Sequence, residues 1–207
     1  LCMQYCEQNG IDTKLHCLVY DKFIPSWLPK DNMAEMERLY EKRFKEISER
    51  YAGKMVEFEV INETLQIPWW KTDSVITSKK DLNEWAFSLA RKYFPNETLV
   101  INEGSVNADV ADKGIWSAYY LEIENALLKG ATIDKIGIQH HIFTGATSKT
   151  EEEYERNVKK EYIRYVDPEL NFKMLDTLGK FGLPLELTEV TIPTFGEGEE
   201  FEELQAE

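Results

Sequence analysis

Five short apolar runs, separated by longer charged stretches, constrain the fold of this chain more than any other feature. The runs are rich in β-branched side chains and cover residues 13–20, 55–62, 98–102, 133–142 and 183–192. Runs of this length are typical of strands buried on both faces, as in parallel sheets. The intervening stretches predict helices at 34–51, 81–94, 113–130, 149–166 and 168–182, and residues 2–10 predict the end of one more helix. This alternation predicts an α/β fold with right-handed crossovers between parallel strands.

Two architectures fit this order: an open doubly wound sheet, or part of a (β/α)8 barrel. No GxGxxG or GxxxxGK[ST] motif follows any predicted strand, so the nucleotide-binding versions of these folds lack their main signature. No low-complexity linker divides the 207 residues. The sequence therefore indicates a single α/β domain.

The net charge excludes one broad class of partner. The 24 basic residues are outnumbered by 38 acidic ones, which gives −14 at pH 7. Nucleic acids and anionic membranes are polyanions, and no apolar run approaches the roughly 20 residues of a membrane-spanning helix. We therefore expect no nucleic-acid partner and no membrane partner.

Polar side chains stand at the carboxyl end of every predicted strand. They are His16 with Tyr20 and Asp21, Asn62 with Glu63, Asn102 with Glu103, Gln139 with His140 and His141, and Thr188 with Glu189. Chemistry in α/β folds gathers at these ends of the strands. The pattern therefore predicts an active site built from several strand ends.

Glycoside hydrolysis by two carboxylates suits these residue types best. One carboxyl protonates the leaving oxygen, while the second attacks the anomeric carbon or activates water. Aromatic rings such as Trp27, Trp69 and Trp70 are able to stack on sugars. Histidine and glutamate also bind metals, but the chain has no HExxH and no His-x-His motif, so we expect no metal and no cofactor.

The residues alone leave several alternatives open. The strand-end glutamates are also compatible with solvated charges that have no catalytic role. Asn-Glu occurs at the ends of two strands, so Glu63 and Glu103 are equal candidates for the acid. His140 and His141 point to opposite faces if the strand continues through them, so at most one lies in the site.

Five segments together resemble glycoside hydrolase family 10, the retaining endo-β-1,4-xylanases. The segments LHCLVYDKFIPSWL, FEVINE, LVINE, IDKIGIQHHI and LELTEVTI are similar to that family's strand motifs, and they lie at 15–28, 58–63, 99–103, 133–142 and 185–192. They occur in the family's order and spacing and span nearly the whole chain. The family's fold is a (β/α)8 TIM barrel, and its substrate is xylan, a β-1,4-linked polysaccharide.

The resemblance assigns roles to individual residues. It implies that Glu63 is the acid/base and Glu189 the nucleophile, which favours Glu63 over Glu103. It implies substrate-binding roles for His16, Tyr20, Trp27, Asn62, Gln139 and His141, of which His141 also bonds the nucleophile. Retention of configuration implies that the two carboxyl groups lie ~5–5.5 Å apart.

Departures from the family pattern affect the predicted specificity. Tyr20 and Asp21 replace the family's Trp-His, Phe58 and Glu59 replace Trp-Asp, and Glu103-Gly104 replaces Asp-Tyr. These changes alter the wall of the sugar pocket and leave both catalytic glutamates in place. They keep open a related barrel glycosidase that acts on another β-glucan or a decorated xylan. The family strands that find no match in this chain keep a second alternative open, a catalytically silent carbohydrate-binding fragment.

The matched segments correspond to the third to seventh strands of the family barrel. We therefore expect residues 1–195 to form an incomplete catalytic barrel domain of about five βα units. The acidic segment 196–207 would lead to the last unit. The remaining barrel segments would come from the same longer chain or from another chain. The family also implies an extracellular or periplasmic location, because the polymer does not enter cells.

Overall fold

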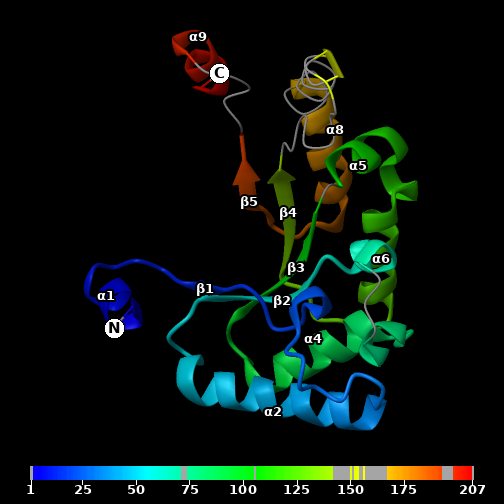
Figure 1. Cartoon of the computed structure of the whole chain (residues 1–207). Helices are drawn as coiled ribbons and strands as arrows, with labels where there is room; N and C mark the ends of the chain where they lie inside the picture. The colour runs from blue at the N-terminus through cyan, green and yellow to red at the C-terminus, as the bar shows by residue number, and fades with distance from the viewer. Residues whose placement is uncertain are drawn as a thin grey trace. The chain divides into compact units, whose positions relative to one another are not determined.

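One five-stranded sheet organises the protein (Figure 1). The computed structural model describes residues 2–70, 74–104, 106–141, 150, 152–153, 156, 167–192 and 198–206. Within these residues the strands are β1 (Lys14–Leu15), β2 (Glu57–Asn62), β3 (Thr98–Glu103), β4 (Lys135–His141) and β5 (Leu185–Thr191). Each of the five predicted runs therefore contains a strand.

The order of the strands distinguishes the two predicted architectures. The sheet runs β1-β2-β3-β4-β5, in the order of the chain, and the β1–β2 and β2–β3 pairs are parallel. A doubly wound sheet reverses its strand order at a switch point, whereas the strands of a (β/α)8 barrel follow one another. The sequential order fits the barrel.

The chain forms two compact units. The first unit comprises residues 1–103 and 122–137, and the second comprises residues 104–121 and 138–207. The division passes through helix α6 (Ala118–Leu128) and through strand β4. Each unit has its own helices packed on its own strands or on one another.

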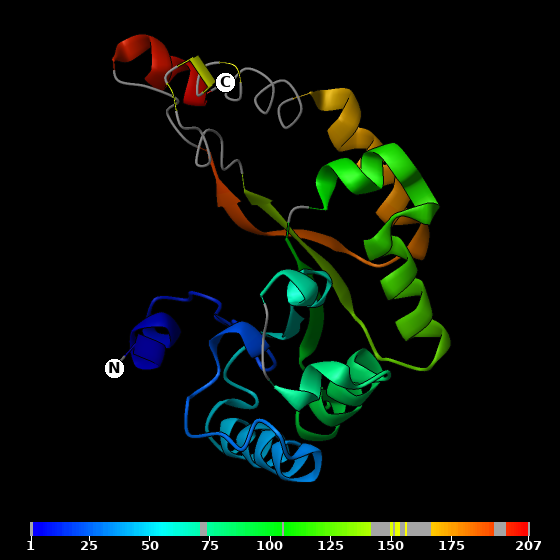
Figure 2. The ribbon, with the colours of Figure 1, turned by 45° about the vertical axis from the view of Figure 1, so that its right-hand side comes forward.

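Two amphipathic helices contribute buried side chains to the core of the first unit. Helices α2 (Met33–Tyr51) and α4 (Leu82–Tyr93) pack against each other, and α4 also packs on β2 and β3 (Figure 2). The ring of Phe94 stacks on that of Phe58 in β2, with 4.1 Å between the centroids. Both predicted helices are confirmed because their apolar spacing matches one buried face.

The starts of these two helices differ from each other. Oδ1 of Asn32 accepts a hydrogen bond from the backbone N–H of Glu35 at 3.1 Å, which caps α2. Asp81 has the sequence of an N-cap for α4, but its side chain makes no capping bond. It lies 3.3 Å from the ammonium group of Lys79 instead. Asp81 therefore precedes α4 without capping it, and its carboxylate pairs with a nearby cation.

Strand β1 is shorter than the predicted run 13–20. Only Lys14 and Leu15 pair as a regular strand, opposite Glu57 and Phe58 of β2. Val19 returns to the sheet as an isolated bridge to Ile61, and the His16–Cys17 peptide bond between them is cis. The run is therefore split into two short contacts with β2.

The predicted helix 113–130 is a 3-10 turn followed by α6, and a further helix that the sequence did not predict comes before it. Helix α5 (Asn107–Lys113) ends at Gly114, whose φ of 58° lies in the left-handed region. A 3-10 turn, η4 (Gly114–Trp116), follows, and α6 begins after Ser117, whose backbone is extended. Glycine adopts a positive φ without steric cost, so Gly114 ends one helix before the next begins.

Short elements complete the first unit. They are α1 (Cys2–Gln8), η1 (Asp21–Phe23), η2 (Thr64–Gln66), α3 (Ile67–Trp70) and η3 (Val75–Ser78). Helix α1 confirms the helix expected at the start of the chain, and Gly10 follows it with a φ of 64°.

Helix α8 (Pro168–Leu178) packs on α5 in the second unit (Figure 2). Asp167 caps α8 by accepting a hydrogen bond from Glu169 N at 2.9 Å, and Pro168 occupies the first turn. The turn η5 (Gly179–Phe181) leads to Gly182 and then to β5. The glutamate-rich end forms α9 (Glu199–Ala206). The predicted helix 149–166 lies almost wholly outside the described residues.

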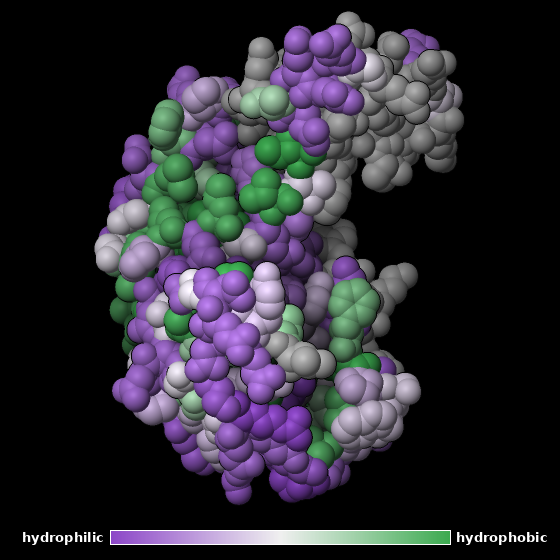
Figure 3. Space-filling view, turned by 90° about the vertical axis from the view of Figure 1, so that its left-hand side faces the viewer, coloured by the Kyte–Doolittle hydropathy of each residue, from purple (hydrophilic) through white to green (hydrophobic). Residues whose placement is uncertain are grey.

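Charged side chains cover the outer face of α2. Hydrophilic residues dominate the lower part of the molecule, where α2 lies (Figure 3). Lys42 and Glu46, and Lys45 and Glu49, pair across one helical turn with N–O distances of 3.7 and 3.9 Å. Among the described residues, no helix has the length and apolar content needed to cross a membrane.

Candidate active site

Glu63 stands at the carboxyl end of β2 in an unusual backbone conformation. Its φ of 54° and ψ of 45° lie in the left-handed region, and it is the sole non-glycine residue with positive φ in the described part of the chain. Its N–H donates to the carbonyl of Asn102 at 3.0 Å, which ties it to the end of β3. Such conformations cluster at functional sites, because they persist only where the surroundings hold them.

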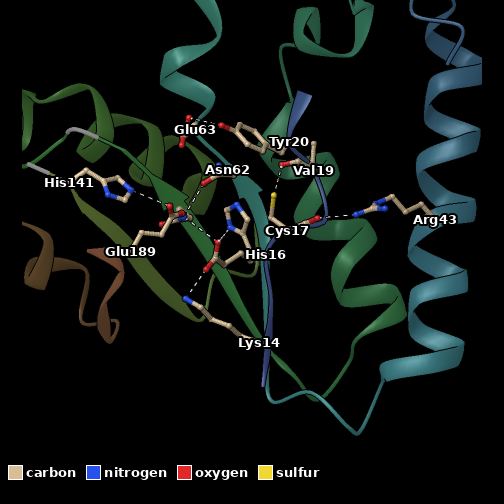
Figure 4. Close-up of polar contacts among 12 residues, drawn as sticks. Lys14, His16, Cys17, Val19, Tyr20, Arg43, Asn62, Glu63, His141 and Glu189 are labelled. Carbon is tan, nitrogen blue, oxygen red and sulfur yellow. Dashed lines mark hydrogen bonds and ion pairs between the residues drawn. The ribbon is translucent and has the colours of Figure 1, made fainter. Parts of the chain in front are cut away.

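The carboxyl group of Glu63 is bound by Tyr20. The Tyr20 hydroxyl donates a hydrogen bond to Oε2 of Glu63 at 2.9 Å (Figure 4). Tyr20 is one of the substrate-binding residues implied by the family resemblance and one of the departures from its pattern. In the first unit, its hydroxyl contacts the candidate acid directly.

Glu103 has a different environment from Glu63. Its side chain is fully buried, at 0% exposure, and Oε2 accepts a hydrogen bond from the backbone N–H of Leu65 at 2.8 Å. Leu65 lies in the turn η2, which begins directly after Glu63. Glu103 therefore supports the turn that follows Glu63, and this buried role favours Glu63 as the acid of the two Asn-Glu pairs.

Glu59 contacts three polar side chains, and one of these, Asn102, also bonds to Asn62. Lys14 Nζ lies 2.8 Å from Oε1 of Glu59, and His16 Nδ1 lies 2.5 Å from Oε2 (Figure 4). Nδ2 of Asn102 donates to Oε2 of Glu59 at 3.2 Å and to Oδ1 of Asn62 at 2.9 Å. The predicted sugar ligands His16 and Asn62 are thus held in one network.

Sequence reasoning named Glu59 as a family departure and gave it no role. The available signal was a glutamate inside an otherwise apolar strand, since a carboxylate in such a strand needs partners when it is buried. Glu59 is fully buried, at 0% exposure, and the contacts described above supply these partners.

Arg43 supports the segment that carries His16. Its guanidinium nitrogens Nη2 and Nε donate to the carbonyl oxygens of Cys17 and Leu18 at 3.1 and 3.3 Å (Figure 4). Because Arg43 lies on α2, it ties the end of the interrupted β1 region to that helix. Nothing in the sequence indicates this contact, since a charged residue on a solvated helix face is ordinary.

Trp27 lies beside a hollow in the first unit. The hollow has a volume of about 560 Å³ and is also lined by His16, Tyr20 and Arg43. The Trp27 side chain is 73% exposed. A large exposed ring beside a hollow suits stacking on a ligand. The side chains of the other two candidate platforms, Trp69 and Trp70, lie outside those described.

His141 binds Glu189 in the second unit. Its Nε2 lies 3.2 Å from Oε2 of Glu189, and its Nδ1 lies 2.7 Å from the hydroxyl of Thr191 (Figure 4). Contacts on both nitrogens fix the orientation of the ring. The predicted pair of His141 and Glu189 is therefore in contact.

His140 has another partner. Its Nδ1 lies 2.6 Å from Nδ2 of Asn107 in α5. Burial lowers the pKa of His140, and the neighbouring charge of His141 lowers it further. The two adjacent imidazoles thus make different contacts, as alternation along a strand requires. Gln139, the remaining β4 candidate, is buried at 3% exposure.

A family model decides the relationship to known proteins. The model for glycosyl hydrolase family 10 matches residues 1–194. The chain belongs to glycosyl hydrolase family 10. Its sequence is 25% identical over 197 residues to endo-1,4-beta-xylanase 1 of Arabidopsis thaliana, covering 94% of this chain and 18% of that protein. It is 26% identical over 201 residues to endo-1,4-beta-xylanase 5 of the same plant, covering 92% of this chain and 31% of that protein.

Solved structures show the same likeness at the level of the fold. Native xylanase 10B from Thermotoga maritima matches 99% of this chain with a TM-score of 0.67 and 23% identity, over 58% of its own length. Xylanase 10B from Thermotoga petrophila RKU-1, in complex with xylobiose, matches 99% with a TM-score of 0.66 and 20% identity, over 57% of its length. This family 10 chain therefore spans a third or less of these curated relatives, and a little over half of these solved chains.

The comparisons confirm the predicted fold class. This family 10 chain holds five strands in barrel order in its described residues and matches a little over half of each family 10 structure. The expected incomplete (β/α)8 barrel accounts for both observations.

Proposed function

We propose that this chain is the catalytic part of a retaining endo-β-1,4-xylanase, with Glu63 as acid/base and Glu189 as nucleophile. One observation carries the proposal: each of these family-aligned glutamates has a bound partner at its strand end. Tyr20 holds Glu63 at 2.9 Å, and His141 holds Glu189 at 3.2 Å. Family membership supplies the reaction class.

The proposed reaction proceeds in two steps. Glu189 attacks the anomeric carbon while Glu63 gives its proton to the departing glycosidic oxygen, which leaves a covalent glycosyl-enzyme. Glu63, now a carboxylate, then takes a proton from water, and the resulting hydroxide nucleophile releases the sugar from Glu189. Two inversions give net retention. This mechanism needs the two carboxyl groups ~5–5.5 Å apart.

The partners of the two glutamates suit these steps. A hydrogen bond from Tyr20 to Oε2 of Glu63 stabilises the carboxylate that remains after proton donation. His141 orients the attacking carboxylate of Glu189, while Thr191 holds the other ring nitrogen. In the proposed site, His16, Asn62, Gln139 and Trp27 bind the sugar chain.

We further propose that additional barrel segments complete the active protein. The described residues contain five strands, and five strands do not close a barrel. The other strands would come from the same longer polypeptide or from another chain. Residues 1–195 would then form the catalytic barrel portion, and 196–207 would lead to its last unit. A polymeric substrate places the enzyme outside the cell or in the periplasm.

A second candidate substrate follows from Tyr20 and Asp21. Their side chains replace two family residues; Tyr20 bonds to the candidate acid, and Asp21 is buried at 6% exposure. This altered wall favours a related barrel glycosidase that acts on another β-glucan or on decorated xylan. A panel of xylan, decorated xylan, β-glucan and cellulose separates these specificities by the rate of reducing-sugar release.

Substitution of individual glutamates tests the proposed roles. In Glu189→Ala we expect reducing-sugar release from xylan to be abolished, and in Glu63→Gln a loss of about 10²–10⁴-fold. Glu103→Gln would retain more activity than Glu63→Gln, provided that thermal unfolding shows it folded. Loss in Glu103→Gln without loss in Glu63→Gln would overturn the acid assignment. Binding of xylan without any hydrolysis would favour the silent carbohydrate-binding fragment.

A further inference from the structure

Three elements of the first unit meet at one carboxyl oxygen beside Glu63. Thr64 follows Glu63 directly, and its hydroxyl donates a hydrogen bond to Oε1 of Glu122 in α6. The same oxygen accepts a hydrogen bond from Nδ2 of Asn83 in α4, at 2.8 Å. Glu122 therefore links the turn after β2 to two helices.

The chemistry of this cluster indicates a neutral carboxyl group. Oε2 of Glu122 and Oδ1 of Asn83 are buried, and neither has a hydrogen-bond partner among the described residues. Two buried acceptors without a donor are costly, more so when one is charged. A proton on Oε2 of Glu122 would remove the charge and turn that oxygen into a donor.

The environment of Glu122 favours that proton. Burial raises its pKa, while the hydrogen bonds from Thr64 and Asn83 oppose the shift without cancelling it. On the helices around the cluster, Glu84 of α4 is paired with Lys129 of α6 at 3.0 Å. On the strand side, Glu103 is bound to the N–H of Leu65. Neither Glu84 nor Glu103 contributes to the raised pKa of Glu122.

The turn that carries Glu63 needs such support. Glu63 itself is left-handed, and the next two residues are each held by a glutamate: Thr64 by Glu122 and Leu65 by Glu103. A non-glycine residue in the left-handed conformation persists only where surrounding contacts hold it. Its position sets the direction of the Glu63 carboxyl group.

We propose that Glu122, acting through Thr64, is a positioning residue for Glu63, given the role of Glu63 as acid/base proposed above. Glu122 contacts no reacting atom in this scheme. It fixes the backbone from which the acid projects, and a displacement of about 1 Å at such a point costs up to ~10²-fold in rate. Neither the strand-end pattern nor the family resemblance pointed to this residue.

Amide hydrogen exchange in the full chain tests the anchoring directly. We expect the Leu65 amide to exchange about tenfold faster in Thr64→Val and Glu122→Ala, because each removes the hydrogen bond that ties the turn to α6. Glu122→Gln should leave exchange within about twofold, since an amide both accepts and donates. Glu124→Gln, on the exposed side of the same helix, is the matched control.

A reference amide separates positioning from general stability. The N–H of Phe94 donates to the carbonyl of Ala90 at 2.7 Å, at the end of α4. Its exchange should not change in these variants. Unchanged exchange at Leu65 in Glu122→Ala, or equal acceleration at Leu65 and Phe94, would overturn the proposal.

Steady-state kinetics test whether the hydrogen bond between Thr64 and Glu122 affects the reaction. In Thr64→Val and Glu122→Ala we expect kcat on xylan to fall about tenfold or more, with KM changed less than about twofold, and Glu122→Gln to restore kcat. A raised KM with unchanged kcat, or equal damage in Glu122→Gln and Glu122→Ala, would contradict the positioning role. If the wild-type protein, completed by its remaining barrel segments, hydrolyses nothing, the proposed function fails instead, and the exchange experiment alone decides the role of Glu122.

Discussion

Three glutamates hold polar groups of the first unit around the proposed acid Glu63. Glu59 binds the predicted sugar ligand His16, Glu103 binds the N–H of Leu65, and Glu122 binds the hydroxyl of Thr64. Part of the acidic composition of this chain therefore lies at the proposed site, where Glu59 and Glu103 are buried and Glu122 is partly buried.

The sequence predicted the strand-end residues, because the end of an apolar run is a local feature. Tyr20, Glu63, His141 and Glu189 were found in this way, although their roles came from the family resemblance. Glu59 and Glu122 received no role, because their partners His16 and Thr64 lie 43 and 58 positions away along the chain. Such contacts depend on tertiary packing that periodicity does not reveal.

The raised pKa of Glu122 predicts a change of stability with pH. The folded chain holds this proton more tightly than the unfolded chain, whose glutamate has an ordinary pKa near 4.5. The stabilising contribution of the neutral carboxyl is therefore full below about pH 4.5 and is lost as the pH rises through the folded-state pKa. Glu122→Gln stays neutral, so its stability relative to wild type should increase with pH.

Denaturant unfolding of wild type and Glu122→Gln between pH 4 and 8 measures this difference. Glu124→Gln, which removes an exposed carboxylate from the same helix, should show a much flatter difference. A constant free-energy difference between Glu122→Gln and wild type across this range would show that Glu122 titrates normally.

At the scale of elements, helices with one strong apolar face were predicted closely. Helix α2 begins within one residue of its predicted start, because Asn32 caps it and Met36, Tyr40 and Phe44 fall on one buried side. Helix α5 was missed, and the predicted helix 113–130 starts at the last residue of α5, because apolar residues continue across the break at which Gly114 and Ser117 leave the helical conformation. Such a break in the backbone leaves the spacing of apolar residues unchanged, so the spacing does not reveal it.

Two glycines between α8 and β5 offer a test of the turn before the strand that carries the proposed nucleophile. Gly182 has a φ of 69°, whereas Gly179, three residues earlier, has an ordinary helical φ of −59°. An added Cβ meets no atom within 4 Å at either position. We expect Gly182→Ala to lower the free energy of unfolding by about 1–2 kcal/mol through backbone strain alone.

Gly179→Ala is the matched control. It should be neutral or stabilising by about 0.4–1 kcal/mol, because alanine restricts the unfolded chain without straining the folded one. Denaturant unfolding of both variants gives the comparison. Equal effects at the two positions would contradict the left-handed turn before β5.

At the scale of the whole molecule, the alternation of strands and helices determined the fold class but not the architecture. Five apolar runs fitted an open sheet as well as a barrel, because periodicity carries no information on strand order. The sequential order β1-β2-β3-β4-β5 and the match to family 10 structures resolved this choice. The division of the chain into two compact units was also not predictable from the sequence, since it passes through α6 and β4 and follows no linker.

The central claim is that Glu189 forms a covalent bond to the sugar. Incubation of the full chain with a 2-deoxy-2-fluoro-β-xylobioside that carries a good leaving group, followed by mass spectrometry of peptides, tests it directly, because the fluorine slows release of the intermediate. We predict one added fluoroxylobiosyl group on the peptide that contains Glu189, and none in Glu189→Gln. Labelling of a different residue, or hydrolysis of the same compound without any adduct, would contradict the proposed double displacement.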